Sequence, residues 1–452
     1  MRIPLSPPDD NVLLSKLFRD PVRAERLGAS FIERLDATPG GRYRHWDTLR
    51  HLRPPGDLSI EEWWLGLKLA RRTGARRVPL LRDARGHPFW LTLVDPILRM
   101  LHAVDQQASG AFRGSAEVVD DRQRETYLMK SLFEEAITSS QLEGAVTTRE
   151  VAKEMLQRGR EPRDKSERMI LNNYSAMEFI RSVRAEPLTP AIVFELHRIL
   201  SDDTMDEPTA AGRFRYSSED IRVYDHQGQV LHVPPPAPEL PARLDALCQL
   251  ANAEADDTFL HPVVRAILLH FGLAYDHPFV DGNGRTARAL FYWAMAHQGY
   301  WLSEYLSISR ILRRAPSKYY RAFLYTETDG NDATYFVLHQ LRVLERSISE
   351  LHRYLERRAS DLRAARRLLV SSTRLQQSLN HRQLALLNHA LKNPGFTYTF
   401  ISHQRSHRIA YQTSRTDLGT LANLGLLIEG KSGRSFHYQA PADLQARMAK
   451  VV

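Results

Sequence analysis

The sequence predicts a mainly helical protein built from three parts, and three observations support this fold class. Apolar residues recur at helical spacing through most of residues 121–353, one alternating segment interrupts them near residues 221–234, and short helices followed by two short strands end the chain. A chain of 452 residues also exceeds one typical hydrophobic core. We therefore expect domains at residues 1–115, 116–355 and 356–452.

Residues 1–115 combine helical and extended signals. In "DLSIEEWWLGLKLARRTG", Ser59 precedes acidic residues and then apolar residues at helical spacing, which is typical of a capped helix start. The "ARGHPFWLTLV" that follows predicts a turn and a short strand. We find no catalytic group of residues here, so we expect a mixed α/β N-terminal domain without an active site.

The segment "DIRVYDHQGQVLHVPPPAPELP" is a predicted β-hairpin within the helical region. Its residues alternate on both sides of "HQGQ", and Pro234, Pro235 and Pro236 end the returning strand. Two strands alone are too few to be stable by themselves. We therefore expect the hairpin near residues 221–234 to cover a site rather than to build the core.

The end of the chain predicts a winged helix. After Arg353, an arginine-rich helical segment leads to three helical segments, "HRQLALLNHALKN", "TYTFISHQRSHRI" and "QTSRTDLGTLANLG". The stretch "LLIEGKSGRSFHYQAP" then supplies two short strands. Residues 413–416 open the predicted recognition helix. Domains with this order bind DNA or dock proteins, so DNA is one expected partner.

Composition restricts the class of protein. The net charge of +9 arises from 62 basic residues that are dispersed among 53 acidic ones, which favours a polyanionic partner only weakly. The one cysteine, Cys248, lies in an apolar helical segment, so no intramolecular disulfide can form. The N-terminus lacks an apolar signal segment and no stretch approaches a membrane span. We expect a cytoplasmic protein without membrane contact.

The stretch "DHPFVDGNGRTAR", residues 276–288, carries the chemistry. Pro278 biases His277 toward extended backbone, so the preceding apolar helix should end just before it. Asn283 and Gly284 favour positive φ, and "DGNGR" should form a cup of backbone amides that opens the next helix. Free amides at the positive end of a helix dipole form an anion site.

Two arginines three residues apart, Arg285 and Arg288, indicate that the anion is a polyphosphate. Cations at a helix N-terminus oppose the dipole unless a polyanion compensates them, and guanidinium groups match phosphate oxygens. Asp281 suits Mg²⁺, which prefers one or two carboxylates together with phosphate oxygens. His277 could then take a proton from an incoming hydroxyl. The pattern is neither a P-loop nor a Rossmann turn, and it predicts metal-assisted phosphoryl or nucleotidyl transfer.

This stretch resembles the Fic (Fido-fold) family, whose motif is HPFx(D/E)GNGRxxR, and "HPFVDGNGRTAR" matches every specified position. The resemblance covers roughly residues 121–353 and implies a helical Fic core. Most members with the full motif transfer AMP from ATP to a hydroxyl side chain of a target protein. By similarity, the base would be His277, the Mg²⁺ ligand Asp281, the cradle of the inner phosphates Gly282, Asn283, Gly284 and Arg285, and the γ-phosphate partner Arg288.

Two further elements of the family have counterparts here. Members use a hairpin flap that ends in His-(Ile/Val)-Pro-Pro to hold the target segment in extended form, and "QVLHVPP" resembles it. The stretch "SKYYRA" resembles the element on the adenine side, which would place Tyr319 and Tyr320 there. The target-binding residues of the flap would be Gln229, Val230, Leu231 and His232.

The stretch "TSSQLEGA" resembles the inhibitory motif (S/T)xxxE(G/N) of many Fic proteins. It supplies Ser139, Glu143 and Gly144 at the end of a predicted helix near residues 125–144, on the N-terminal side of the catalytic motif. A Glu143 carboxylate paired with Arg288 would occupy the fork that receives the γ-phosphate, so the α-phosphate of ATP would be misaligned. The resemblance implies an autoinhibited, Mg²⁺-dependent protein adenylyltransferase.

Other functions stay open at this point. The same residues could remove AMP from a target or transfer another phosphate-containing group, although two arginines favour ATP over donors without a γ-phosphate. A function of another class is a DNA-binding regulator that uses the winged helix, with the Fic domain as a nucleotide sensor. Fic proteins occur as monomers and dimers, which leaves a homodimer open. The sequence does not identify the target protein.

Overall fold

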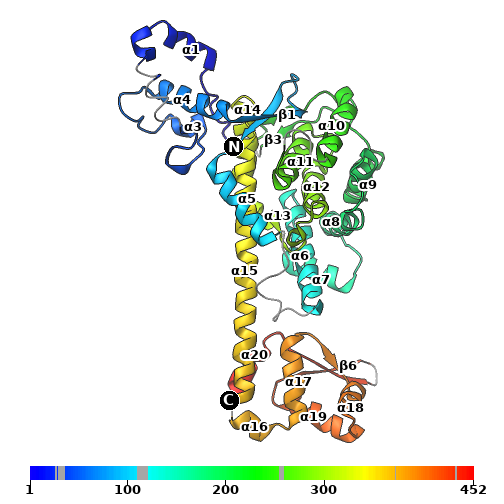
Figure 1. Cartoon of the computed structure of the whole chain (residues 1–452). Helices are drawn as coiled ribbons and strands as arrows, with labels where there is room; N and C mark the ends of the chain where they lie inside the picture. Colours follow the sequence, from blue (N-terminus) through cyan, green and yellow to red (C-terminus); the bar gives the residue numbers. More distant parts are fainter. Residues whose placement is uncertain are drawn as a thin grey trace. The chain divides into compact units, whose positions relative to one another are not determined.

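The computed structural model describes residues 1–25, 28, 36–108, 121–225, 227–253, 259–371, 373–432 and 435–451 (Figure 1). The fold is mainly helical, as predicted. The described residues within 1–113 and 125–348 form one compact unit, and those within 114–124 and 349–452 form a second. The predicted N-terminal and catalytic domains thus share the first unit. Within the described ranges, no helix is both long and apolar enough to cross a bilayer.

The N-terminal part of the first unit contains short helices and a hairpin. Ser59 caps α4 as predicted, because its side chain accepts from the Glu62 N–H and the Glu62 side chain accepts from the Ser59 N–H. β1 pairs antiparallel with β2, whereas the sequence predicts one strand, since the arginines of β1 mask its alternation. The elements are α1 (Asp10–Phe18), η1 (Pro39–Gly41), α3 (Trp46–Leu49), α4 (Ile60–Thr73), β1 (Ala75–Arg82), β2 (Pro88–Thr92) and α5 (Asp95–Ala108).

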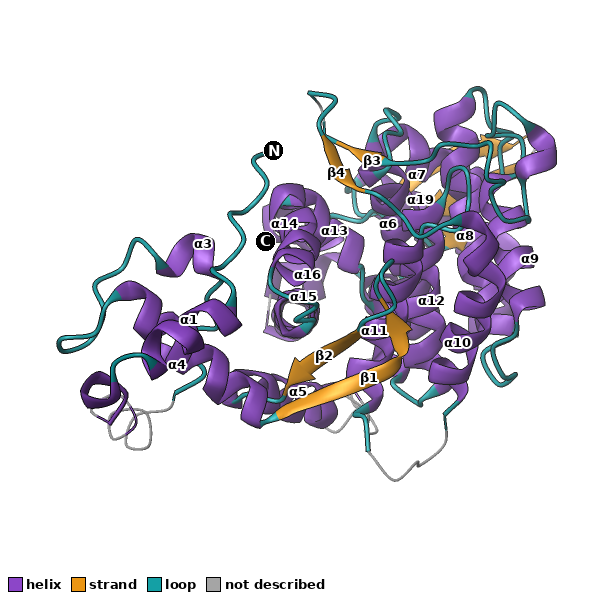
Figure 2. Ribbon diagram, turned by 90° about the horizontal axis from the view of Figure 1, so that it is seen from above, coloured by secondary structure: helices purple, strands orange, loops and turns teal. Residues whose placement is uncertain are grey.

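The rest of the first unit is a helical core in which α11 and α12 pack against each other and against α8, α9 and α10 (Figure 2). Gly272 of α11 allows close packing, because an added Cβ would lie 2.7 Å from Leu247 and 2.9 Å from Leu81. The core therefore fixes both ends of the α11–α12 loop. Its helices are α6 (Asp121–Leu142), α7 (Arg149–Arg158), α8 (Lys165–Ser182), α9 (Pro190–Ser201), α10 (Leu240–Asn252), α11 (Pro262–Asp276), α12 (Asn283–His297), α13 (Ile308–Arg314) and α14 (Pro316–Thr328), with turns η2 (Pro208–Ala210), η3 (Ala237–Glu239) and η4 (Trp301–Tyr305).

A short antiparallel hairpin, β3 (Val223–Tyr224) and β4 (Val230–His232), interrupts the helices of the core. The Asp225 carboxylate closes its turn by accepting from the Gln227 and Gln229 N–H groups, each at 2.9 Å. This hairpin lies within the segment that the sequence predicts as a flap.

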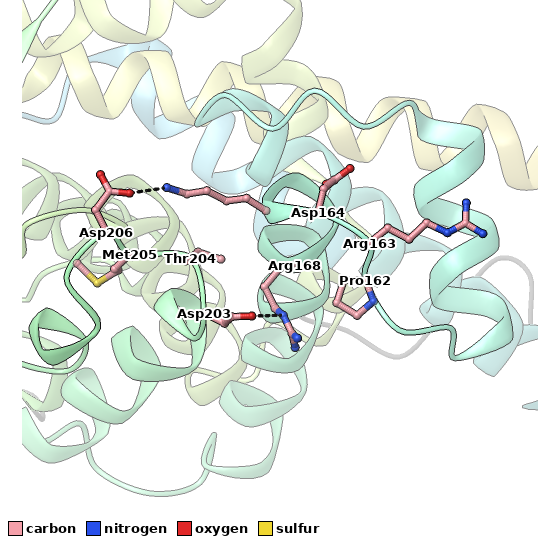
Figure 3. Close-up of a pocket in the computed structure, with 9 residues that line it drawn as sticks. Pro162, Arg163, Asp164, Arg168, Asp203, Thr204, Met205 and Asp206 are labelled. Carbon is pink, nitrogen blue, oxygen red and sulfur yellow. Dashed lines mark hydrogen bonds and ion pairs between the residues drawn. The ribbon is translucent and has the colours of Figure 1, made fainter.

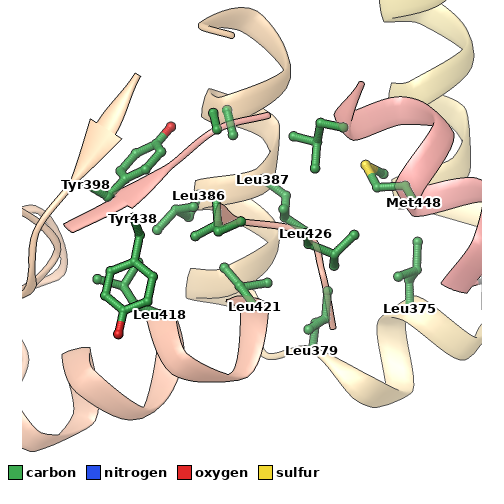
Figure 4. Close-up of a cluster of buried hydrophobic side chains, with 14 of the residues drawn as sticks. Leu375, Leu379, Leu386, Leu387, Tyr398, Leu418, Leu421, Leu426, Tyr438 and Met448 are labelled. Carbon is green, nitrogen blue, oxygen red and sulfur yellow. The ribbon is translucent and has the colours of Figure 1, made fainter. Parts of the chain in front are cut away.

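The second unit packs helices around a three-stranded antiparallel sheet with strand order β5-β7-β6. Leucines from α17 and α19 meet Tyr398 and Tyr438 of the sheet in its core (Figure 4). This cluster gives the unit a hydrophobic core of its own. Its elements are the later part of α15 (Thr334–Ser371), α16 (Thr373–Ser378), α17 (His381–Lys392), β5 (Thr397–Tyr398), α18 (Phe400–His407), α19 (Tyr411–Asn423), β6 (Ile428–Ser432), β7 (Ser435–Gln439) and α20 (Leu444–Val451).

Two details of this unit differ from the sequence expectation. Thr397 and Tyr398, expected in a helix, form β5 because they pair with β7, and α18 begins only after the capping residue Thr399. α19 begins at Tyr411, before the predicted start at residue 413. The order helix, strand, two helices, two strands is the one that defines a winged helix, and that assignment stays a prediction.

Candidate active site

His277 ends α11 and begins the loop that leads to α12. Its backbone is left-handed, with φ 46° and ψ 56°, so the expectation of extended geometry before Pro278 is wrong. The left-handed turn lets the His277 N–H donate to the Leu273 carbonyl at 3.0 Å, and Arg215 Nε donates to the His277 carbonyl at 2.9 Å. These contacts outweigh the preference that the proline imposes.

The His277 imidazole is oriented as a neutral proton acceptor. Nδ1 lies 3.2 Å from the Ala274 carbonyl oxygen, to which it donates, so Nε2 carries the lone pair. Burial lowers the pKa of His277 to about 4, which keeps the ring neutral at pH 7. The residue can therefore accept a proton at Nε2.

The turn before α12 presents backbone amides. Gly282 is the N-cap residue with φ 80° and ψ 1°, and no side chain caps the helix. Positive φ therefore falls at Gly282 and not at Asn283 or Gly284, because those two residues already belong to the helix. The Asn283 side chain fastens the loop instead, accepting from the Phe279 N–H at 2.9 Å and donating to the Phe279 carbonyl at 2.8 Å. The first amides of α12 thus suit an anion.

The end of α6 meets α12 at Arg288, whose side chain is 1% exposed. Glu143 Oε1 lies 2.9 Å from Arg288 Nη1. Arg288 Nε donates to Ser139 Oγ at 2.9 Å, and Nη2 donates to the Ser139 carbonyl at 3.1 Å. Gly144 follows with φ 98° and turns the chain. The fold therefore brings together Ser139, Glu143 and Arg288, which the sequence places about 145 residues apart.

The Glu143 carboxylate also covers the first turn of α12. A Cβ added at Gly284 would overlap it, with Glu143 Cδ only 2.9 Å away. Only glycine at position 284 lets an anionic group approach this turn so closely. The Glu143 side chain is 27% exposed, so it occupies a position that opens to solvent.

Arg285 makes its contacts within the loop itself. Its guanidinium is fully buried, and it donates to the Leu200 carbonyl and to Asp281 Oδ2, both at 3.0 Å. The Asp281 carboxylate is 55% exposed. Arg285 therefore fixes the loop and orients Asp281, while its predicted contact with the inner phosphates stays a prediction.

Asp281 is the residue that fits Mg²⁺ in this site. In the parts of the chain that the structure describes, no group of three or more His, Cys, Asp or Glu side chains could hold a metal ion alone. One exposed carboxylate beside an anion cradle nevertheless matches the donor set of Mg²⁺ that arrives with phosphate oxygens. The metal would thus depend on a bound polyphosphate for its other ligands.

Tyr319, expected on the adenine side, is buried next to Arg288. It is 3% exposed, and its hydroxyl lies 2.8 Å from His270 Nε2. Burial raises the pKa of Tyr319, and Arg288 partly offsets this shift. Burial, together with Arg288, lowers the pKa of His270, so both partners are neutral. Tyr320 is half-buried, so more of its side chain than that of Tyr319 is accessible to an adenine ring. The adenine-side role of both tyrosines stays a prediction.

His232 fastens the flap hairpin to the core. Its Nδ1 lies 2.8 Å from the Glu327 carboxylate on α14, and its Nε2 lies 2.7 Å from the Tyr275 carbonyl on α11. Burial lowers the pKa of His232, but the Glu327 carboxylate and the Tyr275 carbonyl together raise it by more. The net shift of this pKa is therefore upward. Two acceptors require two donating nitrogens, which favours the imidazolium.

The other predicted target-binding residues are accessible on this hairpin. Gln229 is exposed in the turn, and Val230 and Leu231 of β4 are half-buried. A short exposed strand of this kind can pair with an extended peptide through backbone hydrogen bonds.

Comparison with known proteins agrees with this geometry. Residues 187–295 match the model of the Fic/DOC family. The chain carries a Fic/DOC domain. The crystal structure of a Fic family protein from Desulfovibrio desulfuricans G20 has a TM-score of 0.51 and 18% identity, and covers 78% of this chain and 97% of that chain. This likeness shows a shared fold.

Curated relatives of the Fic domain cover less of the chain. The protein adenylyltransferase Fic of Nematostella vectensis is 29% identical over 196 residues, 42% of this chain and 43% of that protein. The protein of the same name from Drosophila melanogaster is 35% identical over 133 residues, 29% of this chain and 25% of that protein. This chain therefore spans less than half the length of these relatives.

Glu135 of α6 is a buried residue near the candidate site that the sequence did not indicate. It is 1% exposed and accepts from Ser307 Oγ at 2.9 Å, from the Ser309 N–H at 3.1 Å and from the Ser309 hydroxyl. It lies one helical turn before Ser139 on the same face of α6, and Glu143 follows just after the helix ends at Leu142. Glu135 thus ties α6 to the start of α13. The sequence offers an acidic residue ahead of the motif, and the fold supplies its serine partners.

A cavity of about 360 Å³ between the start of α8 and the loop after α9 contains none of the predicted site residues (Figure 3). Two ion pairs lie in it, Lys165 with Asp206 at 3.2 Å and Arg168 with Asp203 at 3.5 Å. Its three cationic side chains, Arg163, Lys165 and Arg168, are balanced by three aspartates, Asp164, Asp203 and Asp206. The predicted site residues His277, Asp281 and Arg288 lie instead at the α11–α12 loop and the start of α12.

Proposed function

We propose that this chain is a protein adenylyltransferase that transfers AMP from ATP to a Ser, Thr or Tyr hydroxyl of a target protein, and that Glu143 holds it inactive. The observation that carries the proposal is the contact between the Glu143 carboxylate and the buried Arg288 guanidinium, at 2.9 Å, beside the amides of the α12 start. The names of its relatives, protein adenylyltransferases, support the reaction class.

The chemistry follows from the position of His277. Its Nε2 would take the proton of the target hydroxyl as that oxygen attacks the α-phosphorus of ATP. The new bond joins this oxygen to the α-phosphorus, the bond to the bridging oxygen breaks, and pyrophosphate leaves. Mg²⁺ bound with ATP at Asp281 would offset the charge on the phosphates. The nearby phosphate charge would also raise the pKa of His277 from about 4, which makes it a stronger base.

Inhibition follows from competition for one guanidinium. Arg288 would hold the γ-phosphate, but the Glu143 carboxylate contacts the same fork, and two anionic groups cannot share it. ATP would then bind with its α-phosphate displaced from His277. A displacement of about 1 Å can cost about 10²-fold in rate.

The flap supports a protein substrate. Its strand β4 (Val230–His232) would pair with an extended segment of the target and bring a hydroxyl to His277. Backbone pairing sets the register of the bound segment without strong sequence preference.

Transfer of label from α-labelled ATP tests the proposal. Glu143→Ala should label itself or proteins of a lysate, and Glu143→Ala with His277→Ala should not. Glu134→Ala is the matched control, since Glu134 lies on α6, the helix that leads to Glu143, and pairs with Arg149 instead. Label that survives the loss of His277 contradicts the assigned base, and equal label in wild type and Glu143→Ala contradicts inhibition.

Removal of AMP is the alternative direction of the same site. Once proteins have been labelled by Glu143→Ala, the wild-type chain can be added and released AMP measured. Release that requires Glu143 would assign this chain to AMP removal, because the residue would then orient an attacking water. A stable label assigns it to transfer.

A further inference from the structure

The positive charge of the chain gathers near its C-terminus. Residues 373–452 carry ten arginines and lysines and three aspartates and glutamates, a net charge of +7 out of +9 for the whole chain. The basic residues of this segment therefore provide most of the net attraction for a polyanion. This property belongs to the second unit and is independent of the Fic site.

The second unit presents a helix-turn-helix. α18 (Phe400–His407) and α19 (Tyr411–Asn423) pack against each other and are joined by a turn of three residues. Arg408 begins this turn in the left-handed region, with φ 52°. A turn of this length between two packed helices is the arrangement in which a second helix can enter a DNA groove.

One face of α19 is polar, basic and solvent-facing. Gln412, Arg415 and Thr416 are exposed on it, and Asn423 continues the same face. Gly419 lies between them, and a Cβ added there would meet nothing within 4 Å. A glycine in mid-helix costs about 1 kcal/mol relative to alanine, and packing does not require it here. It leaves room for close approach of a ligand to the helix backbone.

The acidic residue of α19 does not oppose a polyanion. Asp417 is 2% exposed and faces the interior. Its carboxylate accepts from Arg382 Nε at 2.8 Å, from Asn380 Nδ2 at 2.8 Å and contacts His403 Nε2 at 3.1 Å. The negative charge is therefore compensated within the unit, and Arg415 is exposed on the opposite face of α19.

Further exposed cations flank α19. Arg405 lies on α18, Arg408 in the turn and Lys431 on β6, and all three are exposed. Arginine and glutamine or asparagine side chains on one helix face match the donors and acceptors of guanine and adenine edges, while flanking cations suit phosphates.

From these observations we propose that the α18–α19 surface, defined by Arg405, Arg408, Gln412, Arg415, Thr416 and Lys431, binds duplex DNA with α19 in the major groove. This function lies beyond adenylylation and does not depend on it. The positive charge of the surface and the hydrogen-bonding side chains along α19 favour DNA over a protein partner.

Fluorescence anisotropy of the full chain with a labelled duplex of about 20 base pairs tests this proposal. At about 50 mM salt we expect saturable binding that weakens steeply as salt rises. Arg415→Ala should weaken binding about tenfold and reduce the slope of log K against log salt by about one. Lys450→Ala on α20, an exposed cation outside the surface, should bind like wild type.

Two further variants guard against loss of folding as the explanation. Arg415→Lys keeps the charge and should keep the salt slope, whereas Arg415→Glu should lose affinity beyond Arg415→Ala, with unchanged melting temperatures for both. An RNA duplex of equal length should bind more weakly, because its major groove does not admit a helix. The proposal is overturned by the absence of saturable duplex binding, by equal loss in Lys450→Ala and Arg415→Ala, or by equal affinity for the RNA duplex.

Discussion

The two arginines at the start of α12 are held by different parts of the chain. Arg285 donates to Asp281 of its own loop and to the Leu200 carbonyl at the end of α9. Arg288 donates to Ser139 in the last turn of α6 and pairs with Glu143, which directly follows that helix. The Arg285 end of the site, the loop end, is thus held by the loop and the end of α9. The Arg288 end, the α6 end, is held by a separate helix. The contacts of Arg288, unlike those of Arg285, therefore depend on the position of α6.

Removing the carboxylate of the α6 end should have the largest effect. We expect Glu143→Ala to raise the initial rate of adenylylation by about 10²-fold, because the γ-phosphate gains Arg288 and the α-phosphate moves into line. Arg288→Ala in the Glu143→Ala background should abolish this gain. The rates can be measured by incorporation of α-labelled AMP, and a gain that persists without Arg288 would contradict the comparison.

Breaking the loop end should reduce stability rather than release activity. Arg285→Ala removes a buried guanidinium from Asp281 and from the Leu200 carbonyl, which we expect to cost about 2–4 kcal/mol in the free energy of unfolding. Asp281 is half exposed and can regain water, which limits the loss. Urea denaturation measures it. The control Arg198→Ala removes an exposed pair with Glu195 and should change stability by less than about 0.5 kcal/mol.

Weakening the attachment of α6 at Glu135, at a distance from the contact with Arg288, should give partial activation. Glu135→Gln removes the charge that accepts from Ser307 and Ser309, and loss of about 1.4 kcal/mol of anchoring corresponds to about a tenfold gain in rate. The same substitution in Glu143→Ala should add nothing, because inhibition is already absent there. A fall in rate in both backgrounds would show that Glu135 only supports the fold.

The flap should show the smallest effect, as a dependence on pH. The pKa of His232 is raised in the folded chain, so its stabilising contacts with Glu327 and the Tyr275 carbonyl are fully present below pH 6.5 and weaken as pH rises through the folded pKa. Hydrogen exchange of the flap amides, corrected for intrinsic rates, should increase a few-fold at alkaline pH. His232→Gln should remove this dependence, and unchanged protection in wild type would contradict it.

The position of the loop between α11 and α12 could be predicted from the sequence because its residues are contiguous. The stretch from His277 to Arg288 carries the predicted base, the glycines and the arginines within one turn and one helix start, and Pro278 indicates the helix boundary before His277. The capping box at Ser59 is equally local. The backbone of His277 could not be predicted, because Arg215, far earlier in the chain, helps to hold it left-handed.

Contacts that depend on tertiary packing could not be predicted from the sequence. Glu135 contacts serines at the start of α13, and His270 contacts the hydroxyl of Tyr319. Both partners are far from these residues in the sequence. β5 exists because it pairs with β7 about forty residues later, which a two-residue segment cannot reveal. The contact of Glu143 with Arg288 could be predicted only because the motif resemblance linked two segments that are distant in the sequence.

Nucleotide affinity, with and without the γ-phosphate, tests the central claim most directly. Binding of ADP and of a non-hydrolysable ATP analogue should be measured by calorimetry for wild type and Glu143→Ala. If Glu143 blocks only the γ-phosphate position, the substitution should tighten binding of the analogue about tenfold or more and leave ADP unchanged. Equal gains for both nucleotides, or no gain for either, would contradict the claim that Glu143 competes with the γ-phosphate for Arg288.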